Sequence, residues 1–105
     1  YTIGFDGNRL SSYDWGYAQF RTGSKSALVH ITASTEQTHD KGYVALRPLP
    51  VSTDISSSTA LAFASGTNNA EYTIPPHTTF FVGYSKDMSM YDNNDTVEII
   101  ITEIS

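Results

Sequence analysis

The densest group of side chains capable of binding chemistry lies at residues 13–21, which read Tyr-Asp-Trp-Gly-Tyr-Ala-Gln-Phe-Arg. In an extended strand, successive side chains point to opposite faces. One face of this segment would therefore carry Tyr13, Trp15, Tyr17, Gln19 and Arg21. Sugars stack on flat aromatic faces, and Gln and Arg donate hydrogen bonds to hydroxyl groups. Tyr and Trp are also the residue types that dominate protein–protein hot spots. The segment predicts a platform for a glycan or a protein.

A structural interpretation explains the same segment, and from sequence alone it is the one we favour. Trp15 is the single tryptophan of the chain, and tryptophan is highly buried on average. It would lie in the core, with Tyr13 and Tyr17 half-buried beside it. The small residues on the other face, Gly16 and Ala18, would allow close sheet packing. The exposure of the Trp15 indole decides between the two interpretations.

A second candidate contact segment lies near the C-terminal end, at residues 86–95. Methionine and tyrosine side chains on a loop adapt their shape to a partner. Here these residues are Met88, Met90 and Tyr91. The segment is an expected contact loop for a protein or glycan partner.

The same segment ends in oxygen-bearing side chains that include Asp92, Asn94 and Asp95. Carboxylate and amide oxygens are ligands of Ca²⁺. Their spacing does not match the alternating ligand positions of an EF-hand loop. An Asx-rich turn explains the same residues without a metal. We therefore expect no cofactor, and Ca²⁺ is the less favoured alternative.

Catalytic signatures are missing from the sequence. The three histidines, His30, His39 and His77, are far apart and do not form an HExxH motif. A nucleophile elbow, a P-loop and a dinucleotide-binding glycine motif are also absent. Without cysteine there is neither a thiolate nucleophile nor a thiolate zinc site. We expect a protein that is not an enzyme.

Charge and length narrow the classes of partner. The chain has 105 residues, enough for a single domain spanning 1–105, and its net charge is −5. Its six basic residues are scattered singly, whereas nucleic-acid binding requires clustered Lys or Arg. The chain also lacks the run of about 20 apolar residues that a membrane helix needs. We expect neither a nucleic-acid partner nor a membrane span.

Composition favours export. The chain is rich in Ser, Thr and Asn, poor in Lys and free of Cys, and it opens on Tyr1 rather than Met. A removed signal peptide or tag would explain this start. A secreted or cell-surface location is therefore expected, and a bacterial or phage source fits the absence of the disulfides typical of small secreted animal domains.

Short runs of β-branched and aromatic residues alternate with clusters of Gly, Ser, Asn, Asp and Pro, which predicts strands separated by turns. The expected strands are residues 1–5, 14–22, 27–33, 42–49, 60–64, 71–74, 79–85 and 97–104. This spacing is typical of an all-β, two-sheet antiparallel β-sandwich of about seven or eight strands, immunoglobulin-like or jelly-roll-like.

Some of these strands carry more specific expectations. Residues 79–85 and 97–104 should be central strands, and the second should be covered on both faces because both are largely apolar. Residues 60–64 suit either a strand or one short helical turn. Pro48 and Pro50 should make their segment leave the sheet or follow an edge, because proline cannot donate to the ladder.

Three functional hypotheses follow. The first is an extracellular binding module that recognises a glycan or protein. The second is a secreted effector, either a bacteriocin-like antimicrobial or a protease inhibitor. The third is a structural subunit of a surface layer, fibre or virion. Sequence alone leaves the oligomeric state open.

Overall fold

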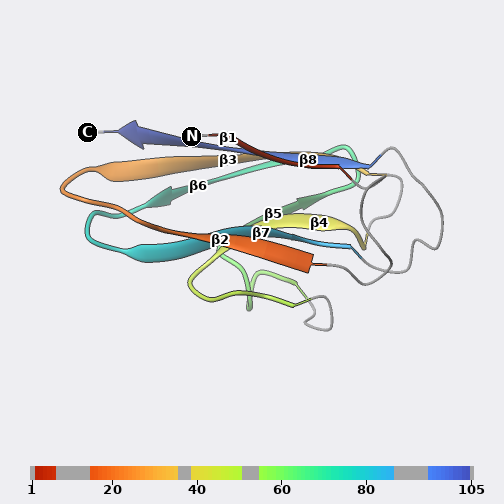
Figure 1. Ribbon diagram of the computed structural model, residues 1–105, viewed down its shortest axis with the longest axis horizontal. Coiled ribbons are helices and arrows are strands. Elements are labelled where there is room, and N and C mark those ends of the chain that lie inside the picture. Colours follow the sequence, from red (N-terminus) through yellow and green to blue (C-terminus); the bar gives the residue numbers. More distant parts are fainter. Residues whose placement is uncertain (1, 7–14, 36–38, 51–54, 87–94, 105) are drawn as a thin grey trace.

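The computed structural model describes residues 2–6, 15–35, 39–50, 55–86 and 95–104. These residues form eight strands and no helix (Figure 1). The strands are β1 (Thr2–Asp6), β2 (Trp15–Arg21), β3 (Ser26–Ser34), β4 (Lys41–Ala45), β5 (Ala62–Ser65), β6 (Asn69–Ile74), β7 (Thr79–Ser85) and β8 (Thr96–Ile104). Each of the eight expected ranges overlaps one strand, so the all-β prediction is confirmed.

Two four-stranded antiparallel sheets are packed together. We call the sheet with order β1-β8-β3-β6 sheet A and the sheet with order β2-β7-β4-β5 sheet B. Each strand pairs with its counterpart counted from the other end of the chain: β1 with β8, β2 with β7, β3 with β6, and β4 with β5. The chain thus follows one long hairpin that is rolled into a sandwich. This is the jelly-roll strand order, one of the two expected sandwich types.

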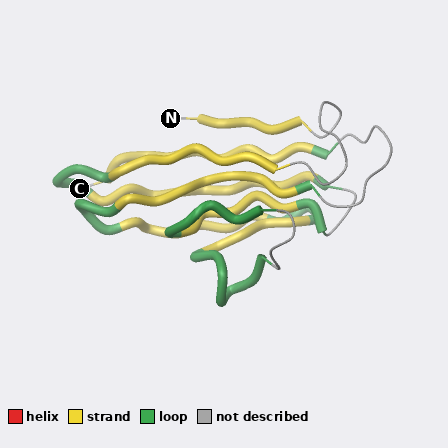
Figure 2. Tube along the Cα trace, turned by 60° about the horizontal axis from the view of Figure 1, so that its bottom comes forward, coloured by secondary structure: helices red, strands yellow, loops and turns green. Residues whose placement is uncertain are grey.

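The main core lies between the sheets and is built from alternate residues of the central strands. Val29 and Ile31 of β3 and Val82 of β7 are fully buried there. Gly42 lets the two sheets approach closely, because a Cβ at this position would clash with the Val97 and Ile31 side chains of sheet A. Figure 2 shows the strands running side by side along the long axis of the molecule.

The central positions of β7 and β8 are confirmed, but the expected coverage of both β8 faces is wrong. On the inner face of β8, Val97 and Ile99 are buried. On the outer face, Glu98 is exposed and Ile100 is only partly buried. The isoleucines of this face give the strand its apolar sequence without a second layer to cover them.

Expected and observed strand boundaries differ most between residues 42 and 64. The expected strand at 42–49 ends at Ala45, and the chain then leaves the sheet as the prolines indicated. The expected strand at 60–64 begins only at Ala62. It follows a turn in which the Ala60 N–H donates to the Ser56 carbonyl (2.8 Å). The expected strand is therefore present in a shortened form, and the alternative of a helical turn at 60–64 is wrong, because the turn lies earlier, at residues 56–60.

The connection between β4 and β5 covers part of sheet B. Its described parts, residues 46–50 and 55–61, lie on the side of sheet B away from sheet A (Figure 1). They supply Leu49, Ile55 and Ala60 to a second buried cluster that also contains Tyr43 and Ala45 of β4. The outer face of sheet B is thus covered over β4 and β5 by the tip of the long hairpin.

Candidate binding surface

Strand β2 presents its predicted face to solvent. Exposed and partly buried residues alternate along the whole strand. Trp15, Tyr17, Gln19 and Arg21 are on the exposed face, with 38% of the Trp15 surface and 48% of the Tyr17 surface accessible. The favoured expectation that Trp15 is a core tryptophan is therefore wrong. The indole lies outside the sandwich because the opposite face of β2 contributes to the core.

The aromatic rings on this face of sheet B form an ordered group that includes the partly buried Phe81. Trp15 and Tyr17 are stacked, with ring centroids 5.8 Å apart and ring planes inclined by 16°. Tyr17 also meets Phe81 of β7 edge to face, with centroids 5.6 Å apart. Both arrangements are favourable for aromatic pairs. We call Trp15, Tyr17 and Phe81 the aromatic patch.

Polar groups continue this surface along β2. Gln19 lies opposite Phe81, and Arg21 lies opposite Thr79. The Arg21 Nη1 donates to the Thr79 Oγ1 (3.0 Å), which orients the guanidinium at the end of the strand. The surface therefore runs from stacked rings to an amide and then to a cation.

A glycine separates the aromatic patch from the covered half of the sheet. Across sheet B, Tyr17 lies opposite Gly83, and Gly83 lies opposite Tyr43. A Cβ at Gly83 would lie 2.7 Å from the Tyr43 Oη and would also clash with the Gly16 carbonyl oxygen. Only glycine allows the Tyr43 side chain to lie over β7 here.

Tyr43 fastens the β4–β5 connection to the sheet. Its fully buried hydroxyl accepts a hydrogen bond from the Leu49 N–H (3.0 Å). Burial raises the pKa of Tyr43, because the interior disfavours the phenolate. Lys41 of β4 also attaches this connection to the sheet, because its Nζ donates a hydrogen bond to the Ile55 carbonyl (2.9 Å). The same Nζ lies 5.0 Å from the centroid of the Phe63 ring.

Of the remaining predicted site residues, the structure describes Asp95 alone. Tyr13, Met88, Met90, Tyr91, Asp92 and Asn94 lie outside the described residues. Asp95 is buried just before β8. In the part of the chain that the structure describes, no three His, Cys, Asp or Glu side chains are grouped as metal ligands. The calcium hypothesis and the contact loop at 86–95 stay predictions.

The histidines do not converge. His30 of β3 has its Nδ1 2.7 Å from the Glu71 Oε1 of β6, on the outer face of sheet A. His77 lies in the turn before β7, where its backbone N–H donates a hydrogen bond to the Gly23 carbonyl (2.9 Å). The His30–Glu71 contact is a partly exposed cross-strand pair, which sheets commonly use for modest stabilisation.

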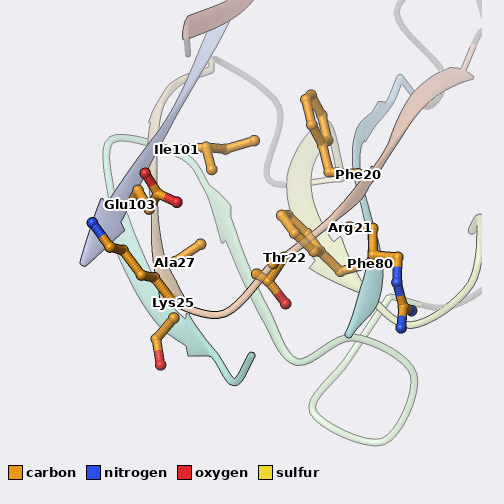
Figure 3. A pocket seen from close by; sticks show the side chains of 10 residues that line it. Phe20, Arg21, Thr22, Lys25, Ala27, Phe80, Ile101 and Glu103 are labelled. Carbon is orange, nitrogen blue, oxygen red and sulfur yellow. The ribbon is translucent and has the colours of Figure 1, made fainter. Parts of the chain in front are cut away.

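A hollow of about 260 Å³ opens between the sheets near the end of β2. Phe20, Phe80 and Ile101 turn toward one another inside it, and Lys25 and Glu103 lie at its rim (Figure 3). The Phe20 and Phe80 rings are stacked with centroids 5.7 Å apart. No histidine is among the described residues that line the hollow. The hollow combines an apolar interior with a polar and charged rim, and its Phe20 ring lies on the opposite face of β2 from the aromatic patch.

Sequence reasoning missed Phe81 as part of the candidate surface. Its alternation with Phe80 and Val82 was visible, but its contact with Tyr17 depends on the pairing of β2 with β7. That pairing joins segments about sixty residues apart, and only the jelly-roll topology specifies it.

Comparisons with known proteins support the fold. No family model and no curated protein matches the sequence. Among solved structures, the chain is similar to PliG of Aeromonas hydrophila, described as a periplasmic lysozyme inhibitor of g-type lysozyme. The match covers 97% of this chain and 83% of PliG, with 9% identity and a TM-score of 0.51. At this identity the likeness concerns the arrangement of strands. In the described part of the chain, no helix is long and apolar enough to cross a membrane.

Proposed function

We propose that this chain is a secreted, non-enzymatic binding domain that recognises an extracellular protein through the aromatic patch, Gln19 and Arg21. The observation that carries the proposal is the exposure of Trp15 and Tyr17 in a stacked pair. Folding normally covers such large rings, and exposed Trp, Tyr and Arg side chains are the residue types that anchor protein interfaces.

The shape of the surface also supports a protein partner. The aromatic patch lies on a sheet face, whereas small molecules are usually bound in concave pockets. The similar fold of PliG, whose description is that of a lysozyme inhibitor, supports an inhibitor-like role for this chain. The proposed function combines two of the three hypotheses from the sequence: an extracellular binding module and a secreted effector that acts as an inhibitor.

The first experiment measures inhibition and binding with g-type lysozyme as the probe. Purified chain is added to the enzyme acting on a peptidoglycan suspension, and complex formation is followed by calorimetry. Inhibition that is lost in Trp15→Ala and Tyr17→Ala supports the proposal. The matched control is Tyr72→Ala, because Tyr72 is similarly exposed (37%) but lies on β6 of sheet A. Inhibition that is equally reduced by Tyr72→Ala would contradict the assigned surface.

A glycan is the second candidate ligand, and the small angle between the Trp15 and Tyr17 rings favours it. Two nearly parallel aromatic faces suit stacking with pyranose rings. Because Trp15 is the single tryptophan, intrinsic fluorescence reports directly on this surface. Titration with soluble peptidoglycan fragments and plant and bacterial polysaccharides should shift the emission if a glycan binds. A blank titration alongside positive lysozyme binding would leave the protein partner as the ligand class.

A further inference from the structure

One edge of strand β2 is not paired with any described strand, and its backbone groups offer a kind of contact that differs from the aromatic patch. Among the described strands, β7 is the single neighbour of β2, which makes β2 an edge strand of sheet B. With seven residues, β2 is longer than the other edge strands, which have five (β1), four (β5) and six (β6). Edge strands that stay unpaired are usually short or carry Lys or Pro. Strand β2 has neither residue type.

The backbone groups on this edge can be assigned. The Thr22 N–H donates to the Thr78 carbonyl (3.0 Å), and the Gly16 carbonyl oxygen points at β7 beside Gly83. In an antiparallel strand, the N–H and C=O of one residue point to the same side, and the side alternates along the chain. The even-numbered residues therefore bond to β7. The N–H and C=O groups of Tyr17, Gln19 and Arg21 point away from the sheet.

The side chains of β2 are complementary to a second copy of the same strand. In an antiparallel pair of β2 strands centred on Ala18, Tyr17 lies opposite Gln19 of the second copy. Trp15 then lies opposite Arg21 of the second copy, and the reverse contacts follow from two-fold symmetry. The 17–19 pair joins residues whose backbone groups point outward, so this register also satisfies the hydrogen-bond pattern at its centre.

Charge selects the same arrangement. Arg21 is the only charged residue of β2. In the register centred on Ala18, the two Arg21 side chains lie at opposite ends of the strand pair, and each lies beside the indole of the other copy. An arginine next to a tryptophan ring gains cation–π attraction. A parallel pairing would instead bring the two guanidinium groups together.

We propose that two copies of this chain associate through antiparallel pairing of their β2 strands about Ala18, which joins the two B sheets into one eight-stranded sheet. The contact closes on itself by two-fold symmetry, so it gives a dimer rather than a fibre. The two aromatic patches then lie on the same face of the joined sheet. The proposal does not depend on the identity of the ligand.

The first test measures mass against concentration by sedimentation and light scattering. The chain should pass from monomer to dimer as its concentration rises. Gln19→Pro removes one outward N–H from each copy and leaves the bonds to β7 intact, so it should weaken association by about tenfold or more. Gln19→Lys should weaken the association by a similar factor, because it places a charged side chain on the edge strand without the backbone effect of proline. Thr73→Lys introduces a lysine at an exposed position of another edge strand, β6, and should leave the association unchanged.

The second test determines the register by cross-linking, because the chain has no cysteine of its own. Ala18→Cys places two thiols opposite each other, whereas the Tyr17→Cys thiols are displaced by two residues, roughly 7 Å along the strand. Under mild oxidation Ala18→Cys should form the disulfide-linked dimer at least about tenfold faster. A chain that stays monomeric at its highest soluble concentration overturns the proposal. Dimerisation insensitive to both Gln19 variants, or faster linkage at position 17, overturns it as well.

Discussion

The two halves of the outer face of sheet B contain similar aromatic residues that end in opposite environments. Over β4, Tyr43 is fully buried under the β4–β5 connection. Over β2, Tyr17 occupies the same row of the sheet, across Gly83, and nearly half of its surface is exposed. In both strands the tyrosine points to the outer face of the sheet. Burial is therefore decided by the β4–β5 connection, whose described residues pack over the half of the sheet that contains β4.

The largest effect is expected at the boundary between the two halves. Gly83→Ala would place a Cβ against the Gly16 carbonyl and 2.7 Å from the Tyr43 Oη. Because a backbone atom cannot move aside easily, we expect a loss of about 3 kcal/mol or more of unfolding free energy. The control is Gly23→Ala, whose Cβ would meet nothing within 4 Å. Similar urea midpoints for the two variants would contradict this role of Gly83.

The next effect tests the cover itself by comparing two leucines of the β4–β5 connection. Leu49 is fully buried in the second cluster, whereas Leu46 is 59% exposed. Leu49→Ala should cost about 2–4 kcal/mol, because it removes buried methyl groups and leaves a cavity. Leu46→Ala should change stability by less than about 0.5 kcal/mol. Equal costs in chemical denaturation would show that the connection does not form a packed layer.

A smaller effect is expected from the hydroxyl that holds the cover. Tyr43→Phe removes the acceptor of the Leu49 N–H and leaves this buried donor without its partner. The expected cost is about 1–2 kcal/mol near neutral pH. Tyr72→Phe, at an exposed tyrosine of sheet A, should be nearly neutral. A neutral result for both variants would remove Tyr43 as the fastening point.

Tyr43→Phe also tests how the unfolding free energy depends on pH, and the direction of the expected difference can be stated. Because burial raises the pKa of Tyr43 above its usual value near 10, the unfolded chain loses this proton first. The stability that comes from the neutral hydroxyl is complete below pH 10 and is lost as the pH rises toward the folded pKa. Between pH 10 and 12, Tyr43→Phe should lose less stability than the unmodified chain. Parallel alkaline profiles from thermal unfolding would refute this.

The smallest stability effects are expected on the exposed half. Trp15→Ala and Tyr17→Ala each remove a stacked ring that remains largely in solvent, so each should cost no more than about 1 kcal/mol. If these rings serve binding, ligand affinity should fall sharply while the thermal midpoint moves little. A destabilisation as large as that of Leu49→Ala would indicate that they belong to the folded framework instead.

Most of the fold could be predicted from the sequence, because turn residues mark the strand ends. Pro75 and Pro76, for example, separate β6 from β7, and Gly23 with Ser24 separates β2 from β3. The central position of β8 followed from its apolar residues. The coverage of its outer face did not, since isoleucine also occurs on half-exposed sheet faces, as Ile100 shows.

The candidate surface could be predicted only in part. Alternation placed Trp15, Tyr17, Gln19 and Arg21 on one face, and the structure has them there. Whether that face was core or surface depended on where the β4–β5 connection folds, which no local pattern in β2 encodes. The position of Phe81 beside Tyr17 likewise required the β2–β7 register.

The pairing of β1 with β8 has a consequence for how the chain reaches this structure. Thr2 lies opposite Ile100, so this strand pair joins segments separated by nearly the full chain length. The chain segment that a strand pair encloses is shortest for β4 with β5, at the tip of the long hairpin. It becomes longer for each further pair, up to β1 with β8. Such non-local pairings carry a high loop-closure entropy and slow folding. We therefore expect refolding in milliseconds to seconds, with order spreading from β4 and β5 toward the two ends of the chain.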